Sequence, residues 1–194
     1  GAGDWVYETL NPIAANVTAL TTAYTGMIAG GGNDLPESQL EALMQLALRA
    51  QTEVGFQSNA AKFVVLFTDA NFHIAGDGAS AGITTPNNGD AILDGGGLGE
   101  DYPIIAQVKA ALEAANIIPI FAIAGGFEPA YNALATALGR GTVVTLTANS
   151  SNVVQAIVNG LATATTTHIA DAVGGVGDDT LIGGAGNDRY LFDT

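Results

Sequence analysis

Cysteine is absent from this chain of 194 residues, and basic residues are scarce. The lack of thiols excludes disulfides and thiolate metal sites. Five Lys and Arg stand against nineteen Asp and Glu, which gives a formal net charge of −14. A surface of that charge repels phosphate groups, so nucleic acid and anionic lipid are poor partners. The excess of acid fits either solubility in a salty medium or calcium binding, which needs clustered carboxylates.

Long apolar runs and catalytic motifs are also missing. The longest apolar runs, at residues 63–67 and 117–124, fall well short of the roughly 20 residues of a membrane-spanning helix. The start of the sequence does not read as a signal peptide. No G-x-S-x-G or H-E-x-x-H motif occurs, and the Gly-rich stretch after Asp94 lacks a P-loop lysine. We therefore expect neither membrane insertion nor enzymatic activity.

What is present is a core-forming chain with alternating helix and strand patterns. Hydrophobic residues make up 48% of the sequence, enough for one compact domain with an appendage. The patterns predict helices at 36–50, 102–115, 128–138 and 153–164, and strands at 63–67, 117–124 and 142–146. Strands joined by helices indicate a parallel sheet covered on both faces. The strand at 63–67 is apolar throughout and is expected to be buried on both faces, and a long polar loop follows it at 71–101.

Two acidic residues occupy positions where a sheet of this kind binds ligands. Asp69 follows the strand at 63–67, and ligands gather outside the carboxyl ends of parallel strands. Pro36 and Glu37 are predicted to form the first turn of a helix after a Gly-rich loop. Each acid also has an ordinary interpretation, Asp69 as a turn former and Glu37 as a partner of the helix dipole.

The composition changes to glycine and aspartate near the end of the chain. Residues 165–173 are predicted to be a linker, and residues 174–194 a separate segment. Within it, residues 174–191 contain GGVGDDTLI followed by GGAGNDRYL, two copies of the nine-residue RTX signature of parallel β-roll turns. Such turns bind Ca²⁺ through backbone carbonyls, here of Gly174 and Gly183, and through the carboxylates of Asp179 and Asp188. A flexible linker explains the repeat poorly, and without calcium we expect the segment to be disordered.

Four segments resemble the integrin β-subunit I-like domain, in the same order along the chain. They are NDLPESQLEALMQ, FVVLFTDANFHIAGDG, DYPIIAQVKAALEAANIIPIFAIA and FEPAYNALATALGRGTVVTLTANSSNVVQAI. The resemblance implies a doubly wound von Willebrand factor A fold over residues 1–164, with a metal-ion-dependent adhesion site. Its central ion, usually Mg²⁺, ligates a carboxylate of the partner protein.

The same resemblance implies individual metal ligands. Asp69 and Glu37 belong to the adhesion site, and Asp34, with Glu37 and the Pro36 carbonyl, serves a neighbouring Ca²⁺ site. Asn33 lies one position from the Asn of the family pattern. The Ala148 carbonyl falls where the family offers a backbone oxygen to a third ion. His73 matches a histidine of the pattern and is interpreted as structural.

One departure from the family concerns the Asp-x-Ser-x-Ser motif of the adhesion site, which these residues lack. The match begins inside the family domain, so we expect its N-terminal half, with the first three strands, to be missing. The strand at 63–67 would then be an exposed apolar edge that recruits another strand. We expect another chain or a precursor fragment to complete the sheet.

Two functions remain open from the sequence. The first is a secreted or cell-surface adhesion module that binds an acidic residue of a protein ligand through a divalent cation. The RTX resemblance implies bacterial one-step secretion and folding triggered by external calcium. The alternative is a structural subunit of an extracellular filament or sheath, whose incomplete sheet is completed by a neighbour.

Overall fold

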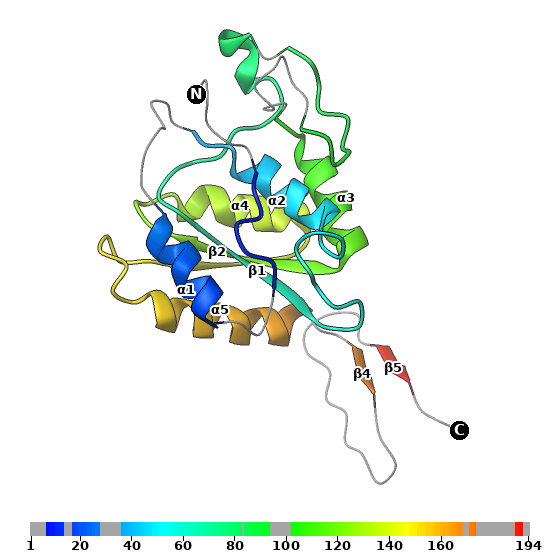
Figure 1. Cartoon of the computed structure of the whole chain (residues 1–194), viewed down its shortest axis with the longest axis vertical. Helices are drawn as coiled ribbons and strands as arrows, with labels where there is room; N and C mark the ends of the chain where they lie inside the picture. The colour runs from blue at the N-terminus through cyan, green and yellow to red at the C-terminus, as the bar shows by residue number, and fades with distance from the viewer. Residues whose placement is uncertain are drawn as a thin grey trace. The chain divides into compact units, whose positions relative to one another are not determined.

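The computed structural model describes residues 7–13, 17–27, 36–82, 84–93, 102–168, 171–173 and 189–191. In chain order its elements are α1 (Val17–Gly26), α2 (Gln39–Leu48), β1 (Lys62–Thr68), η1 (Asp77–Ala81), α3 (Ile105–Ala115), β2 (Ile117–Ile123), α4 (Glu128–Leu138), β3 (Thr142–Thr145), α5 (Val153–His168), β4 (Asp171–Val173) and β5 (Arg189–Leu191) (Figure 1). They fall into two compact units. One comprises Gly1–Lys62 with Ala70–Ile117, and the other Phe63–Asp69 with Ile118–Thr194.

The second unit is built on a sheet with the strand order β1-β2-β3. β2 and β3 are parallel, with Ile120 opposite Thr142 and Ile123 opposite Thr145. The N–H of Ala124 donates to the carbonyl of Thr68 at 2.9 Å, which joins the carboxyl ends of β2 and β1. All three strands therefore run in one direction, as the alternation of helix and strand predicts.

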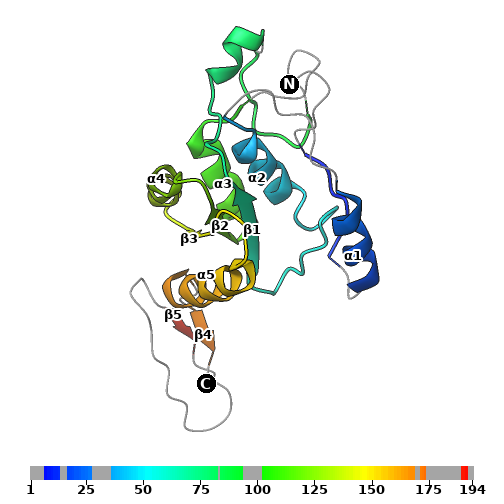
Figure 2. The same ribbon diagram turned by 90° about the vertical axis from the view of Figure 1, so that its left-hand side faces the viewer.

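Helices cover both faces of this sheet because β2 is apolar at every position. All seven of its residues are buried. Ile118 and Ile120 pack against Ala164 of α5, whereas Phe121 points the other way and packs against Tyr131 of α4, with ring centroids 5.4 Å apart. Figure 2 shows α5 along one face of the sheet and α4 on the opposite face. The alternation of strand side chains thus separates the two layers.

The burial of β1 differs from the sequence prediction. Phe63 and Val65 pack into the core against α5, but the strand is mostly half-buried, and Phe67 is 44% exposed. The expectation of burial on both faces was therefore wrong for this strand. The reason is its position, since β1 is the outer strand of the sheet among the described residues.

In the first unit, α2 and α3 pack against each other. Their buried apolar residues are Leu40, Leu43, Met44 and Ala47 in α2 and Val108, Ala111 and Leu112 in α3. Both helices begin later than predicted. Glu37 does not lie in a first helical turn, because its backbone forms an isolated parallel bridge with Phe72. Pro103 also precedes its helix, and its carbonyl accepts from the N–H of Ala75 at 3.1 Å.

The end of the chain also differs from the prediction. α5 continues to His168, and β4 covers Asp171–Val173, so the predicted linker at 165–173 is largely regular structure. β4 pairs in parallel with β5, with Asp171 opposite Arg189. The α1 helix was not predicted at all, and it buries none of its residues. Over the described ranges, no helix is both long enough and apolar enough to span a membrane.

Candidate functional site

A pocket lies at the carboxyl ends of the three parallel strands. Its volume is about 440 Å³, and its lining residues are Phe67, Thr68, Asp69, Ala124, Gly125, Leu146, Ala148 and Ser150. Among the described residues of this lining, Asp69 is the only charged one, and it is exposed. This is where an open parallel sheet binds its ligands, so the pocket is the leading candidate for the functional site of the second unit.

The backbone next to Asp69 is held from two neighbouring elements. The Thr68 carbonyl accepts from the Ala124 N–H at 2.9 Å. The Thr68 side chain hydrogen-bonds to Tyr131 of α4, which is 0% exposed. Burial raises the pKa of Tyr131 to about 12, an effect that the hydrogen bond from Thr68 partly offsets. The phenol is therefore neutral at physiological pH, and its hydroxyl is held in one place.

Gly125 closes the pocket on the β2 side. Its φ is +77°, and a Cβ built on it would lie 3.3 Å from the Asp69 carbonyl oxygen and 3.4 Å from the Phe127 ring. Gly126 also has a positive φ of +86°, but a Cβ there would meet no heavy atom within 4 Å. Glycine at 125 thus permits both the turn and the close approach to the backbone of Asp69.

The loop from β3 to α5 is held by asparagine side chains. Asn152 accepts from the Thr147 N–H at 2.9 Å and donates to the Thr145 carbonyl at 3.0 Å. Asn149 accepts from the Ser151 N–H at 3.1 Å. Ala148 lies within this fixed loop, is exposed, and lines the same pocket as Asp69. The structure thus brings two of the ten predicted metal ligands to one place.

Glu37 and Pro36 belong to the first unit. The Glu37 N–H donates to the Asn71 carbonyl at 2.9 Å, and the His73 N–H donates to the Glu37 carbonyl at 2.8 Å. His73 also stacks on Tyr102, with ring centroids 4.3 Å apart, and its Nδ1 lies 3.4 Å from the Asp77 carboxylate. These contacts agree with a structural role for His73.

The other predicted ligands lie outside the described residues. They are Asn33, Asp34, Gly174, Asp179, Gly183 and Asp188. Within the ranges that the structure describes, no three or more His, Asp or Glu side chains gather as a potential metal site. Among the described residues, the pocket lining therefore offers one carboxylate, that of Asp69, together with hydroxyl and backbone oxygens.

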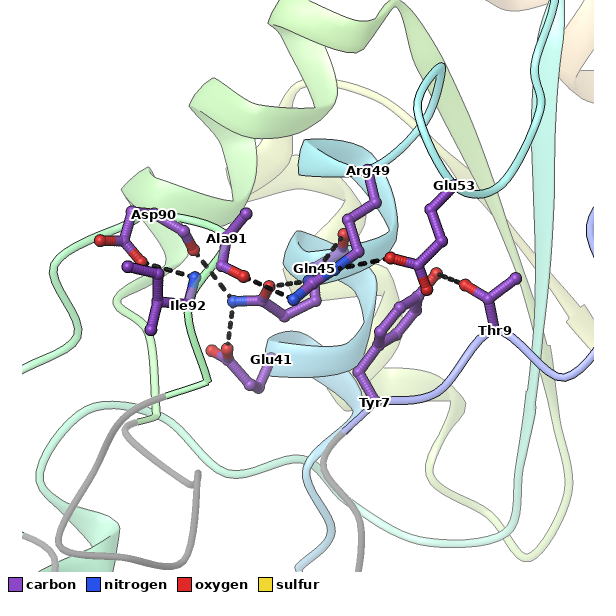
Figure 3. Close-up of polar contacts among 9 residues, drawn as sticks. All are labelled: Tyr7, Thr9, Glu41, Gln45, Arg49, Glu53, Asp90, Ala91 and Ile92. Atoms are coloured by element: carbon purple, nitrogen blue, oxygen red, sulfur yellow. Dashed lines mark hydrogen bonds and ion pairs between the residues drawn. The ribbon is translucent and has the colours of Figure 1, made fainter.

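A second polar cluster, which sequence reasoning missed, anchors the loop after η1 to α2 (Figure 3). Glu41 is 0% exposed and accepts from Gln45 Nε2 and from Asn87 Nδ2, each at 2.7 Å. Gln45 Nε2 also donates to the Asp90 carbonyl at 3.0 Å. Arg49 donates to the Gln45 side-chain oxygen and to the Ala91 carbonyl. The sequence did contain a signal for this cluster, since Glu41, Gln45 and Arg49 place a polar residue at every fourth position along the helix.

Arg49 connects this cluster to the N-terminal segment. Its Nε lies 3.1 Å from the Glu53 carboxylate, and its guanidinium carbon lies 5.2 Å from the centre of the Tyr7 ring. Tyr7 in turn shares a hydrogen bond of 2.7 Å with Thr9. Burial is the main cause that raises the Tyr7 pKa above its usual value. These contacts fasten residues 7–9 to the C-terminal end of α2.

Comparison with known proteins places these features in a family. Residues 3–167 match the family described as integrin beta chain VWA domain. The chain is 40% identical to human integrin beta-7 over 134 residues, which is 66% of this chain and 16% of that protein. It is 39% identical to integrin beta-1-B of Xenopus laevis over 133 residues, and 30% identical to integrin beta-PS of Drosophila melanogaster over 156 residues, 78% of this chain and 18% of that protein. The chain thus spans about a sixth of the length of these relatives.

Proposed function

The chain belongs to the integrin beta chain VWA family, and on that premise we propose that it is a metal-dependent adhesion module. A divalent cation held at Asp69 ligates a carboxylate of a protein partner. The observation that carries the proposal is the exposed Asp69 carboxylate in the pocket at the carboxyl ends of β1, β2 and β3. The sequence resemblance to this family is confirmed by the comparisons.

The donor set of the pocket fits a hydrated cation. Mg²⁺ is commonly bound through one or two carboxylates while it retains several waters. Asp69 supplies one carboxylate, and a pocket of about 440 Å³ leaves room for waters and for a partner oxygen. A bound ion would provide an open coordination position, and the Asp69 carboxylate and the Ala148 carbonyl would be its ligands at this pocket.

The charge of the protein also favours binding of an acidic partner through a cation. The chain has a formal net charge of −14, so an acidic partner is repelled at long range. A divalent ion beside Asp69 reverses the local sign, and direct ligation then gives specificity for a carboxylate. The ligands that we propose for this ion and for neighbouring ions are Asp69, Glu37, Asp34, Asn33, Pro36 and Ala148, with Mg²⁺ at the adhesion site and Ca²⁺ beside it.

We propose a second, calcium-dependent role for the end of the chain. The sequence from 174 to 191 holds two nine-residue repeats, and β4 pairs in parallel with β5 at an offset of 18 residues, from Asp171 to Arg189. Such an offset equals two repeats, which is the register of a roll with two repeats in each turn. Gly174, Asp179, Gly183 and Asp188 are the proposed Ca²⁺ ligands, and export to the cell surface or medium would supply the calcium.

The outer position of β1 supports a second candidate, a structural subunit. β1 is half-buried, and Phe67 is 44% exposed at the edge of the described sheet. An apolar edge strand pairs readily with a strand from another chain. A filament or sheath built in this way would persist in chelator, whereas adhesion through a cation would not.

The test is calorimetric titration of Mg²⁺ and Mn²⁺ into the chain after chelator treatment, with Asp69→Asn and Glu113→Gln compared side by side. Each variant removes one negative charge, but Glu113 lies on α3, paired with Lys109. We expect Asp69→Asn to lose the tightest site and Glu113→Gln to keep it. Equal titration curves for the two variants would refute a metal site at Asp69. Light scattering in chelator then decides the structural alternative, since defined oligomers there would favour it.

A further inference from the structure

We propose that Tyr131 is a positioning residue for the Asp69 carboxylate and that it acts through the hydroxyl of Thr68. The inference rests on the proposed function, because it concerns the same metal site. It assigns to α4, an element that contributes no lining residue to the pocket, a part in setting the metal affinity.

The Tyr131 hydroxyl is fixed because the whole side chain is enclosed. Tyr131 and Phe121 are both 0% exposed, and their rings lie 5.4 Å apart. Leu134 and Leu138, further along α4, are also buried, at 1% and 0% exposure. The helix is therefore held by its own apolar face, and the phenol cannot swing away from Thr68 without disturbing packing.

Thr68 passes this constraint to its neighbour in the chain. Its carbonyl is bound to the Ala124 N–H at 2.9 Å, and its side chain is bound to Tyr131. Thr68 is thus held at two atoms, its carbonyl from the end of β2 and its side-chain hydroxyl from α4. With its φ of +77°, Gly125 approaches the next carbonyl, that of Asp69 itself.

The Asp69 carboxylate, in contrast, is exposed, and no hydrogen bond or ion pair to it is found in the described part of the chain. A side chain with this freedom gives weak metal binding unless its backbone is pre-organised, because ordering it on binding opposes affinity. The Thr68–Tyr131 bond is the contact that supplies this order from outside the pocket.

The experiment measures Mn²⁺ affinity by calorimetry for the whole chain, well below the temperature of unfolding. The variants are Tyr131→Phe, Thr68→Val, the double variant, and Thr68→Ser, which keeps a hydroxyl. Thr136→Val is the matched control, since it removes an exposed α4 hydroxyl that bonds only within the helix, at 2.9 Å to the Asn132 carbonyl. Loss of one hydrogen bond predicts an affinity reduced about 3- to 10-fold for Tyr131→Phe and for Thr68→Val.

The double variant should bind no more weakly than the weaker single variant, because both changes break one bond. Thr68→Ser and Thr136→Val should bind as the unsubstituted chain does. The inference is overturned if Tyr131→Phe binds Mn²⁺ normally, or if the two losses add. Should Tyr131→Phe not fold, normal Mn²⁺ binding by Thr68→Val would still overturn the inference. A chain whose Mn²⁺ binding is unchanged by Asp69→Asn would instead defeat the proposed function.

Discussion

The hydrogen bonds of the buried Glu41 carboxylate allow a specific prediction about the stability of the chain. Glu41→Gln keeps the shape of the side chain but replaces one acceptor oxygen with an NH₂ group. Both carboxylate oxygens accept from amides, one from Gln45 and one from Asn87, each at 2.7 Å. One amide in the variant therefore faces another donor in a buried position. Neither amide can simply flip, because the Gln45 oxygen accepts from Arg49 and the Asn87 oxygen accepts from the Gly89 N–H.

The magnitude follows from the unsatisfied donor. A buried donor without an acceptor costs about 1–3 kcal/mol, while removal of a buried charge relieves desolvation and acts in the opposite direction. The stability of the single variant mixes these two effects. A cycle with Asn87→Ala separates them, because the donor clash disappears when the Asn87 amide is absent. We expect Glu41→Gln to be less destabilising in the Asn87→Ala background by about 1–2 kcal/mol.

The assay is urea unfolding of the four chains at pH 7, with hydrogen exchange of the amides of residues 87–92 in each. Glu41→Gln should accelerate exchange in this loop, because the Asn87 and Asp90 contacts hold it to α2. A coupling energy below about 0.5 kcal/mol, which is the usual scatter for independent sites, would refute the anchoring of the loop by Glu41. Unchanged exchange in the loop would refute it independently.

Three further predictions concern the second unit. The Tyr131 pKa of about 12 exceeds its unfolded value near 10, so its contribution to stability is complete below pH 10 and is lost as the pH rises toward 12. Tyr131→Phe should therefore reduce the dependence of the unfolding free energy on pH in this range by the equivalent of about one proton, as measured by urea unfolding. Gly125→Ala and Gly126→Ala both place a side chain at positive φ, but only the first pushes on the Asp69 carbonyl. We expect the two variants to be destabilised to a similar degree and only Gly125→Ala to bind Mn²⁺ more weakly. Equal Mn²⁺ binding by the two variants would contradict this. Gly160→Ala places a Cβ 2.5 Å from a side-chain methyl of β2. The cost of overpacking, about 1–3 kcal/mol, should outweigh the gain in helix propensity of about 1 kcal/mol. A raised melting temperature would refute this.

The strongest sequence patterns were the most reliable predictors of structure. The helix at 128–138 matches α4 at both ends, and the run at 117–124 matches β2 within one residue. In both, local patterns and burial agree, since β2 is apolar throughout and α4 carries Tyr131, Leu134 and Leu138 on its buried face. Where one apolar helix face or one apolar run determines which residues are buried, the sequence alone predicts the element.

Predicted element boundaries were wrong where hydrogen bonds that the hydrophobic pattern does not reveal determine the ends of a helix. Glu37 lies outside α2 because its backbone pairs with residues 71–73, more than thirty positions away in the chain. α5 extends beyond Ala164 although threonine is a weak helix former. Thr165 and Thr166 bond back to the carbonyls of Leu161 and Ala162, at 2.7 and 3.1 Å, so their hydroxyls are satisfied within the helix.

The candidate site was also predictable only in part. The position of Asp69 at the carboxyl end of β1 follows from the strand pattern alone, whereas Ala148 was reached only through the family resemblance. The contact of Tyr131 with Thr68 could not be predicted from either. It depends on how α4 packs against the sheet, which brings together residues more than sixty positions apart.

The division of the chain into two interleaved units has a consequence for the order of events in folding. The chain makes β1 at residues 62–68 and then leaves the second unit for the whole of Ala70–Ile117 before it returns with β2. During synthesis β1 is therefore made well before β2, its neighbour in the described sheet, and cannot pair with it until residues 70–117 have been added. Closing so long a loop slows folding and prolongs the exposure of an aggregation-prone strand. A truncated product that ends before Ile118 should consequently be a substrate for chaperones rather than a stable fragment.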